Sequence, residues 1–349
     1  MANRYLTVFL LSGMLVSCKE SDIFDSAVVL QDVPEHCLTL SPDQSFDGKF
    51  VKNLSFADMN IVSDSILLIR EGVANAESPY YYKAYSLSDC TYMGQLLRKG
   101  NGPGEFQIPQ IVGHCNGTSC YAFDISLNRL FEFDLVKSMN DSLCCLVDTM
   151  KLPHSTLYAF PYKGGLRYVE NIELDRVVSH LFDSEGDVAG TYSIYSDYVS
   201  AGRYISQLGH SVVLNPSRDK VAMFMLGLPQ VGIMDLNTGE VASSAVDKEY
   251  KNWRKIISEY NTDSVIYYSD AEDAGDVILA VYRGISIAET YTPSATAHIH
   301  VFDWDGRFLY DFSLNENIMS IVYDRIHQYI YAMDAVNETI YRYDVSIIR

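Results

Sequence analysis

Two histidines each follow a glycine, and imidazole is the side chain here best suited to bind a divalent metal. His114 follows Gly113, and His210 follows Gly209. Neutral imidazole is a common metal ligand. The spacing fixes no third ligand, and a histidine beside a glycine also suits a closely packed strand held by hydrogen bonds. His114 and His210 are therefore candidates for a divalent metal site, and no other cofactor is expected.

Signatures of catalysis are absent from the sequence. It contains neither Gly-x-Ser-x-Gly nor His-Glu-x-x-His. The glycines between residues 100 and 104 lack the Gly-Lys-Ser/Thr of a phosphate-binding loop. His298 and His300 alternate along one expected strand, while Arg283 and Arg325 could orient an anionic ligand. The residues thus favour a non-catalytic protein over an enzyme.

The charge balance excludes some classes of partner. The 349 residues include 26 Lys+Arg against 45 Asp+Glu, a formal net charge of −19. Nucleic acid needs a basic face, so it is not expected as a partner. Electrostatic docking to anionic lipid is equally disfavoured. A cationic or neutral ligand suits the total charge better than an acidic one, although local charge can oppose the total.

The N-terminus predicts export and a lipid anchor. Residues 1–17 carry Arg4 and then a mostly apolar run, which is too short to span a membrane and is typical of a signal peptide. The run ends in Leu15-Val16-Ser17-Cys18, which resembles a bacterial lipobox. Cys18 would become the lipidated first residue, with residues 18–35 as a tether and membrane contact through the lipid alone. The alternative is an ordinary secretory signal with a chance cysteine.

The residues after Cys18 bear on localisation. Lys19-Glu20-Ser21-Asp22 resembles the tag that directs some Gram-negative lipoproteins to the outer surface. We therefore expect attachment to the outer membrane of a bacterial envelope, with the cell surface as one of two faces that the protein could occupy. The sequence does not choose between the periplasmic and surface-facing leaflets.

Six further cysteines occur in a chain for which export makes disulfides permissible. They are Cys37, Cys90, Cys115, Cys120, Cys144 and Cys145. Cys115 and Cys120 flank a four-residue turn that could bring their Cβ atoms together. The alternative is that all six are reduced thiols packed as small hydrophobic side chains.

The sequence predicts a repeated all-β architecture, and its strands would position the candidate residues. Tyr121-Ala-Phe-Asp124 and Phe131-Glu-Phe-Asp134 are ten residues apart, as are Tyr331-Ala-Met-Asp334 and Tyr341-Arg-Tyr-Asp344. Weaker copies give six units, most of them close to the length of a propeller blade. This predicts a six-bladed β-propeller with four-stranded blades over residues 36–349.

Two features depart from a simple repeat. Residues 247–260 place aromatic and aliphatic side chains at helical spacing after Asp247, so one inserted helix is expected. The last unit lacks a fourth strand, and residues 36–40 could supply it by pairing with the last blade. Closure of this kind removes a free sheet edge, and we expect a monomer.

A glycine-rich segment carries a family resemblance. Gly100-Asn-Gly-Pro-Gly-Glu-Phe106, followed by Pro109, is similar to the loop that joins the first two blades in the TolB-like, NHL-related six-bladed β-propeller lipoproteins of Gram-negative bacteria. In this loop Gly100, Gly102 and Gly104 permit positive φ, Pro103 stiffens the turn, and Glu105 precedes Phe106, which would anchor the loop between blades. The resemblance implies a fold and no chemistry.

Repeat alignment places a set of polar side chains at the mouth of the expected channel. These candidates for ligand binding are Asp64, His114, Tyr162, His210, Tyr268, Tyr323 and Arg325. Concave mouths with a few polar groups are common ligand sites. The sequence thus predicts a binding or scaffold protein for a peptide, glycan or protein partner. The alternative is a metal-dependent lactonase-like or lyase-like enzyme that uses His114 and His210 in the channel.

Overall fold

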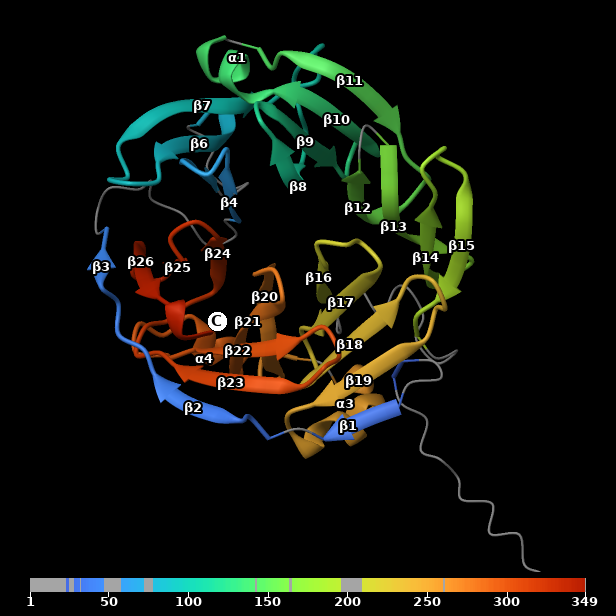
Figure 1. The fold of residues 1–349 in the computed structure, drawn as a ribbon, viewed down its shortest axis with the longest axis vertical. Coiled ribbons are helices and arrows are strands. Elements are labelled where there is room, and N and C mark those ends of the chain that lie inside the picture. The colour runs from blue at the N-terminus through green and yellow to red at the C-terminus, as the bar shows by residue number, and fades with distance from the viewer. Residues whose placement is uncertain are drawn as a thin grey trace, which may run out of the picture.

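Six antiparallel sheets are arranged around one central axis (Figure 1). This computed structural model describes residues 23–24, 28–31, 33–46, 58–71, 78–141, 143–162, 165–195, 209–259 and 261–348. Cys18 and the predicted signal peptide lie outside these residues. The predicted all-β, six-bladed propeller with four-stranded blades is confirmed.

Each blade is a meander in which successive strands pair. Blade one has β4 (Met59–Val62), β5 (Ile66–Arg70), β6 (Tyr80–Ser86) and β7 (Tyr92–Arg98). Blade two has β8 (Pro109–Asn116), β9 (Ser119–Asp124), β10 (Arg129–Asp134) and β11 (Leu146–Lys151). Blade three has β12 (Thr156–Tyr162), β13 (Gly165–Glu173), β14 (Arg176–Phe182) and β15 (Val188–Ser193).

The second half of the ring repeats this order. Blade four has β16 (His210–Leu214), β17 (Lys220–Met225), β18 (Gln230–Asp235) and β19 (Val241–Ala245). Blade five has β20 (Val265–Asp273), β21 (Val277–Ser286), β22 (His298–Asp303) and β23 (Phe308–Ser313). Blade six has β24 (Ser320–Asp324), β25 (Tyr329–Asp334) and β26 (Thr339–Asp344).

The hydrophobic core is divided among the interfaces between neighbouring blades. Each of the six interfaces has its own cluster of buried side chains. Between blades four and five, for example, the ring of Phe224 lies 5.3 Å from Tyr268 and 5.8 Å from Phe302, centroid to centroid. A middle strand such as β17 or β18 is buried on both faces, because its sheet is packed between two others.

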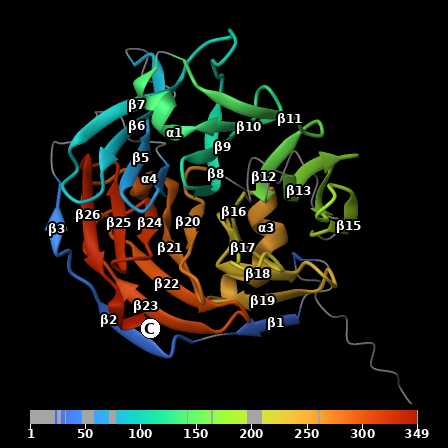
Figure 2. The same cartoon turned by 45° about the horizontal axis from the view of Figure 1, so that its top comes forward.

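The N-terminal segment adds one strand to the outer edge of each of the last three blades (Figures 1 and 2). We call β1 (Val28–Gln31), β2 (His36–Thr39) and β3 (Gln44–Ser45) the belt. β1 pairs in parallel with β19, and β2 pairs in parallel with β23. β3 pairs antiparallel with β26 and is the fourth strand of blade six.

An N-terminal strand therefore closes the last blade, but it is not the strand that the sequence suggested. Residues 36–40 were expected there, yet His36–Thr39 is the fifth strand of blade five. Gln44–Ser45 fills the position in blade six. Both segments are short and largely exposed, and neither has a strong apolar pattern, so the sequence gave little basis for choosing between them.

The predicted tether over residues 18–35 also differs from the structure. Phe24 is 1% exposed and stacks on Tyr195, with ring centroids 5.6 Å apart. An ideal Cβ on Gly232 of β18 would lie 2.6 Å from the Phe24 ring, so glycine leaves the space that this ring occupies. Phe24 and β1 therefore pack on blade four, although we had expected this part of the chain to be a tether.

Short helices occupy the connections between strands. They are α1 (Leu135–Asn140), η2 (Lys248–Asn252), α3 (Trp253–Ser258), α4 (Ile287–Thr290) and η3 (Ser346–Ile348). The helix predicted after Asp247 is present as a 3₁₀ turn that leads into α3. Asp247 caps it by accepting a hydrogen bond from the Glu249 amide. Trp253 is buried against the core between blades three and four. The sequence patterns gave no signal for α1 or α4.

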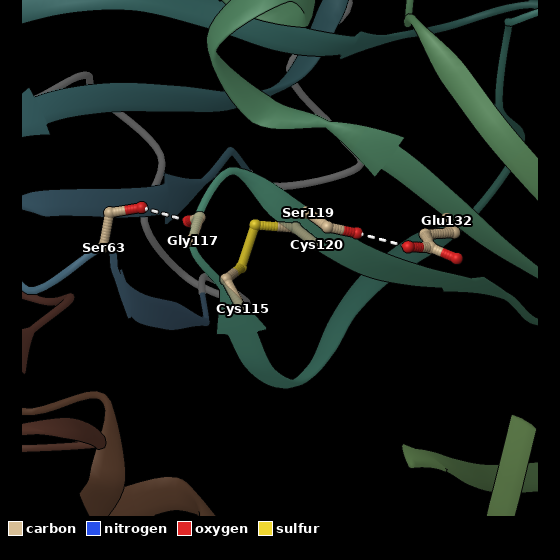
Figure 3. Close-up of a disulfide and its surroundings, with 6 residues drawn as sticks. All are labelled: Ser63, Cys115, Gly117, Ser119, Cys120 and Glu132. Atoms are coloured by element: carbon tan, nitrogen blue, oxygen red, sulfur yellow. Dashed lines mark hydrogen bonds between the residues drawn. A yellow bond between two sulfur atoms is a disulfide. The ribbon is translucent and has the colours of Figure 1, made fainter. Parts of the chain in front are cut away.

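A disulfide joins Cys115 and Cys120 across the turn between β8 and β9, with their Cα atoms 4.4 Å apart (Figure 3). The pairing that the turn suggested is thus present. The Ser63 hydroxyl of blade one donates to the Gly117 carbonyl at 2.6 Å, and Ser119 contacts Glu132 of β10 at 2.5 Å. Among the described residues, Cys37, Cys90, Cys144 and Cys145 take part in no disulfide.

Candidate ligand site in the central channel

The first strand of every blade faces the central axis. These innermost strands are β4, β8, β12, β16, β20 and β24 (Figure 1). Residues from all six line a cavity of about 370 Å³, which we call the inner cavity. It extends beyond the strand ends to Asn215, Arg218 and Arg325. A ligand in this cavity would contact the whole ring.

A second cavity, of about 440 Å³, lies where β20 and β24 begin, and we call it the mouth cavity. Asp58, Gln110 and Asp270 line both cavities. Most of the wall area of the mouth cavity is apolar, although eight of its fourteen lining residues are polar or charged. A concave site with apolar area and convergent polar groups suits a small molecule. The two cavities together form a candidate ligand site along the channel.

Two arginines line the mouth cavity. Arg70, at the end of β5, is 7% exposed, and Arg283, on β21, is 4% exposed. Arg283 donates to the Ile318 carbonyl and to the Asn317 side chain. Burial lowers the pKa of Arg283 to about 10, which still leaves it cationic at neutral pH. A strongly acidic chain thus places two positive charges at the mouth of its channel.

The Arg70 guanidinium has fewer hydrogen bonds to the described residues than that of Arg283. Its Nη1 lies 4.0 Å from the Asp58 carboxylate, beyond hydrogen-bond distance. Within the described part of the chain, its Nε and Nη2 have no hydrogen-bond partner, and the same holds for Nε of Arg283. A buried polar group without a partner costs about 1–3 kcal/mol, and a charged group costs more. Such a group is commonly satisfied by a ligand or by water.

Three carboxyl groups around the channel have raised pKa values. Desolvation raises the pKa of Asp58, against the attraction of Arg70 and a hydrogen bond from the Tyr82 hydroxyl. Desolvation likewise raises the pKa of Asp270 to about 6. Desolvation, with repulsion from Asp270 and Asp273, raises the pKa of Glu272 to about 8. At neutral pH the channel is therefore less negative than its composition suggests.

Hydrogen bonds and an ion pair fix two of the channel acids. Asp270 accepts from the Ser320 hydroxyl at 2.6 Å and from the Ile321 amide at 2.9 Å, so it joins blade five to blade six. Asp273 and Arg325 form an ion pair at 2.5 Å. These contacts hold the acidic side of the channel in one arrangement.

Of the predicted channel residues whose side chains the structure describes, Arg325 alone lines the inner cavity. Asp64 is exposed in the turn after β4 and lines neither cavity. Tyr323 packs in the core between blades five and six, and Tyr268 is buried with its hydroxyl bonded to His300. The two tyrosines are not on the channel, because alternate strand residues point into the sheet interfaces and not toward the axis.

One of the two candidate metal ligands, His210, is held by other side chains. His210 is buried, with its Nε2 3.1 Å from Glu170 and its Nδ1 2.7 Å from the Tyr195 hydroxyl. Both ring nitrogens of His210 are thus occupied by the protein. The side chains of His114 and Tyr162 lie outside the described residues. His210 is the first residue of β16, the innermost strand of blade four, but its ring is directed to Glu170 of blade three.

Sequence reasoning missed Arg70, Asp58, Asp270 and Glu272. The segment Ser269-Asp-Ala-Glu-Asp273 held a usable signal, since its acidic residues alternate within a run that otherwise reads as a buried strand. Asp58 and Arg70 stand at the two ends of the β4–β5 hairpin, and nothing in their local sequence marks them as neighbours.

Backbone hydrogen bonds hold the glycine-rich loop at residues 100–106 in place. The Gly100 amide donates to the Phe106 carbonyl at 3.0 Å, and the Phe106 amide donates to the Arg98 carbonyl at 2.9 Å. Gly104 has φ +74°, in the region that favours glycine. The Glu105 side chain accepts from the Gly102 amide at 2.9 Å. Phe106 is fully buried among residues of blades one and two.

Comparison with known proteins identifies the fold and no activity. No protein-family model and no curated protein matches this chain. A solved structure of a DUF4221 family member from Bacteroides vulgatus aligns with a TM-score of 0.55 and 10% identity, over 87% of this chain and 97% of that one. A Bacteroides fragilis structure, described as an exported protein, aligns with a TM-score of 0.48 and 14% identity, over 82% and 80%.

Proposed function

We propose that this chain is a non-catalytic binding propeller of the bacterial envelope that holds the carboxylate of a peptide in its mouth cavity. The observation that carries this proposal is the pair of buried arginines, Arg70 and Arg283, at that cavity. Guanidinium groups recognise carboxylates through charge-assisted hydrogen bonds, which are stronger than neutral ones. A carboxylate would also give the unpaired Arg70 groups the partner that they lack.

The rest of the cavity suits a peptide better than a free inorganic anion. Asp58 and Asp270 stand beside the arginines, so the site offers both signs of charge. Its other walls include Leu226, Ile266 and Met319. A peptide carries a carboxylate, amide donors and apolar side chains, and so matches all three kinds of surface. A glycan, which the sequence also suggests as a partner, is a separate arm of the test below.

The positive charge of the two arginines at the mouth cavity favours an anionic ligand, although the total charge of the chain favours a cationic or neutral one. The net charge of −19 favoured a cationic or neutral ligand. Desolvation, with repulsion from Asp270 and Asp273, raises the pKa of Glu272 in the inner cavity to about 8, which removes one negative charge from the channel at neutral pH.

The binding test uses a matched pair of probes. The first is an N-acetylated tripeptide of apolar residues with a free C-terminal carboxylate, and the second is the same peptide with a C-terminal amide. The free carboxylate should bind more tightly, and Arg70→Gln should weaken that binding by about tenfold or more. Arg307→Gln removes a mostly exposed arginine and should leave it unchanged.

Two results would refute the proposal. One is equal affinity for the amide and the carboxylate, and the other is binding that Arg70→Gln does not change. Binding of an acidic oligosaccharide in the presence of Arg70, without binding of either peptide, would assign the site to a glycan instead.

We place the protein at the outer membrane, facing either the periplasm or the cell surface, anchored through Cys18. The support is the lipobox-like Leu15-Val16-Ser17-Cys18 together with the resemblance to TolB-like, NHL-related propeller lipoproteins. Among the described residues, no helix has the length and hydropathy to cross a bilayer. Metabolic labelling with a clickable palmitate should mark the wild type and not Cys18→Ala; label on the variant would contradict the anchor.

A further inference from the structure

Two histidines and an aspartate converge at one point on blade five, away from the channel. His298 and His300 lie two residues apart on β22, so both side chains are on the same face of the sheet. Asp311 of β23 pairs directly with His300 in the antiparallel register. One ligand atom from each of the three lies within 4.8 Å of the other two. Neighbouring strands thus bring together a set of side chains that commonly bind metals.

Among the described residues, the contacts within this group leave Nε2 of His300 without a hydrogen bond. His298 Nδ1 lies 2.7 Å from an Asp311 carboxylate oxygen, which is a normal hydrogen-bond distance. His300 Nε2 lies 3.8 Å from the same oxygen, which is too far for one. The other nitrogen of His300, Nδ1, contacts the Tyr268 hydroxyl at 3.2 Å. A cation that accepts the Nε2 lone pair would fill the remaining gap.

The His300 ring is held in place from several sides. The Tyr282 ring stacks on it with centroids 4.2 Å apart and an interplanar angle of 16°. The Phe308 centroid lies 4.6 Å away. Metal-binding histidines are usually oriented by a hydrogen bond at the second ring nitrogen, and Tyr268 occupies that position here. Because the ring is already fixed, little ordering would be needed when a metal binds.

The group is also open to solvent on one side. The His298 side chain is 35% exposed and that of Asp311 is 24% exposed, whereas that of His300 is 5% exposed. A metal could therefore enter from the surface and keep a water ligand. Two imidazoles with one carboxylate suit borderline divalent metals such as zinc.

We propose that His298, His300 and Asp311 form a zinc site in which water completes the coordination. Zinc binds nitrogen and carboxylate oxygen at about 2.0–2.2 Å, which places neighbouring ligand atoms roughly 3.4 Å apart in a tetrahedral site. The two distances to Asp311, 2.7 and 3.8 Å, lie on either side of that value. The site stands next to the belt, because Asp311 also pairs with Cys37 of β2.

The test is a zinc titration of the chelator-treated mature protein by isothermal titration calorimetry. We expect one zinc per chain, and His298→Ala and Asp311→Asn should each weaken binding by about tenfold or more. His298 and Asp311 are partly exposed, so both variants should fold, and far-UV circular dichroism checks this. The matched control is His327→Ala, which removes another histidine paired with an aspartate at 2.7 Å and should leave zinc affinity unchanged.

Several outcomes would overturn the proposal. The first is no zinc binding by the wild type, and the second is affinity that both variants retain. The third is binding that His298→Ala spares but iodoacetamide abolishes, because this would place the metal on the free cysteines. Cobalt substitution gives a second measurement: visible absorption of four-coordinate cobalt should appear in the wild type and be lost in Asp311→Asn.

Discussion

Arg342 and Asp43 form a two-point ion pair although they are 299 positions apart in the sequence. Arg342 Nη2 lies 2.6 Å from one carboxylate oxygen, and Nε lies 3.1 Å from the other. The Arg342 guanidinium also stands 4.3 Å from the centre of the Tyr329 ring. The pair joins the segment before β3 to the last blade, so it fastens the point at which the ring closes.

Asp43→Asn should therefore lower stability at the closure. The pair is partly exposed, and we expect a loss of about 1 kcal/mol in the free energy of unfolding. Urea denaturation measures this, and added salt should reduce the difference from wild type. Asp263→Asn, in an exposed turn, is the control and should change little. Equal stability of all three proteins would show that β3 closes the ring without this ion pair.

Phe24→Ala tests whether the chain before β1 contributes to stability. The ring is buried against Tyr195 and occupies the space left by Gly232. Truncation of a buried phenylalanine costs about 3–5 kcal/mol. Val33→Ala, at a position that is 85% exposed, should have almost no effect in the same urea experiment. A small effect of Phe24→Ala would mean that the free tether extends at least through residue 24.

Glu272→Gln should flatten the dependence of stability on pH. The pKa of Glu272 is raised in the folded state to about 8, so the folded protein binds more protons than the unfolded chain above the ordinary glutamate pKa. Wild-type stability should then fall as the pH rises from 5 to 8. Over the same pH range, the melting temperature of Glu272→Gln should fall by about 2–4 °C less than that of the wild type. An unchanged slope, as expected for exposed Glu185→Gln, would contradict the raised pKa.

Reduction of the Cys115–Cys120 disulfide should destabilise the protein. The bridge closes a short loop between residues five positions apart, for which loop entropy gives about 2 kcal/mol. Dithiothreitol should lower the urea midpoint of the wild type. The double variant Cys115→Ala/Cys120→Ala should already have a lower midpoint and show no response. A response in the double variant would mean that dithiothreitol acts elsewhere.

The blades were predictable because the aromatic-rich segments that end in aspartate form strands, and the aspartate caps the turn that follows. Asp334, for example, accepts hydrogen bonds from the Val336 and Asn337 amides. Such local chemistry repeats with the blade. The closing strand was harder to assign because β2 and β3 are both short and largely exposed, and pairing across the ring decides which of them meets β26.

The candidate ligand site was predictable only in part. The sequence marked Arg283 as a residue that could orient an anion, but it gave no sign of Arg70, and both lie on strands of blades one and five that are not innermost. Repeat alignment searched the innermost strands alone and so selected Tyr268 and Tyr323, which pack between blades. His298 and His300 were visible as a pair, but Asp311 joins them only through the strand register.

The belt also sets an order in which the molecule can be finished. β1, β2 and β3 are made first, yet their partners lie at residues 242–245, 310–313 and 341–342. In each pairing the two strands are more than two hundred residues apart in the sequence. Contacts between residues so distant in sequence form slowly. The first strands must therefore stay unpaired after their synthesis while the blades form. The ring stays open until Tyr341 and Arg342 have been made, which leaves the nascent chain dependent on whatever shields strand edges in its compartment.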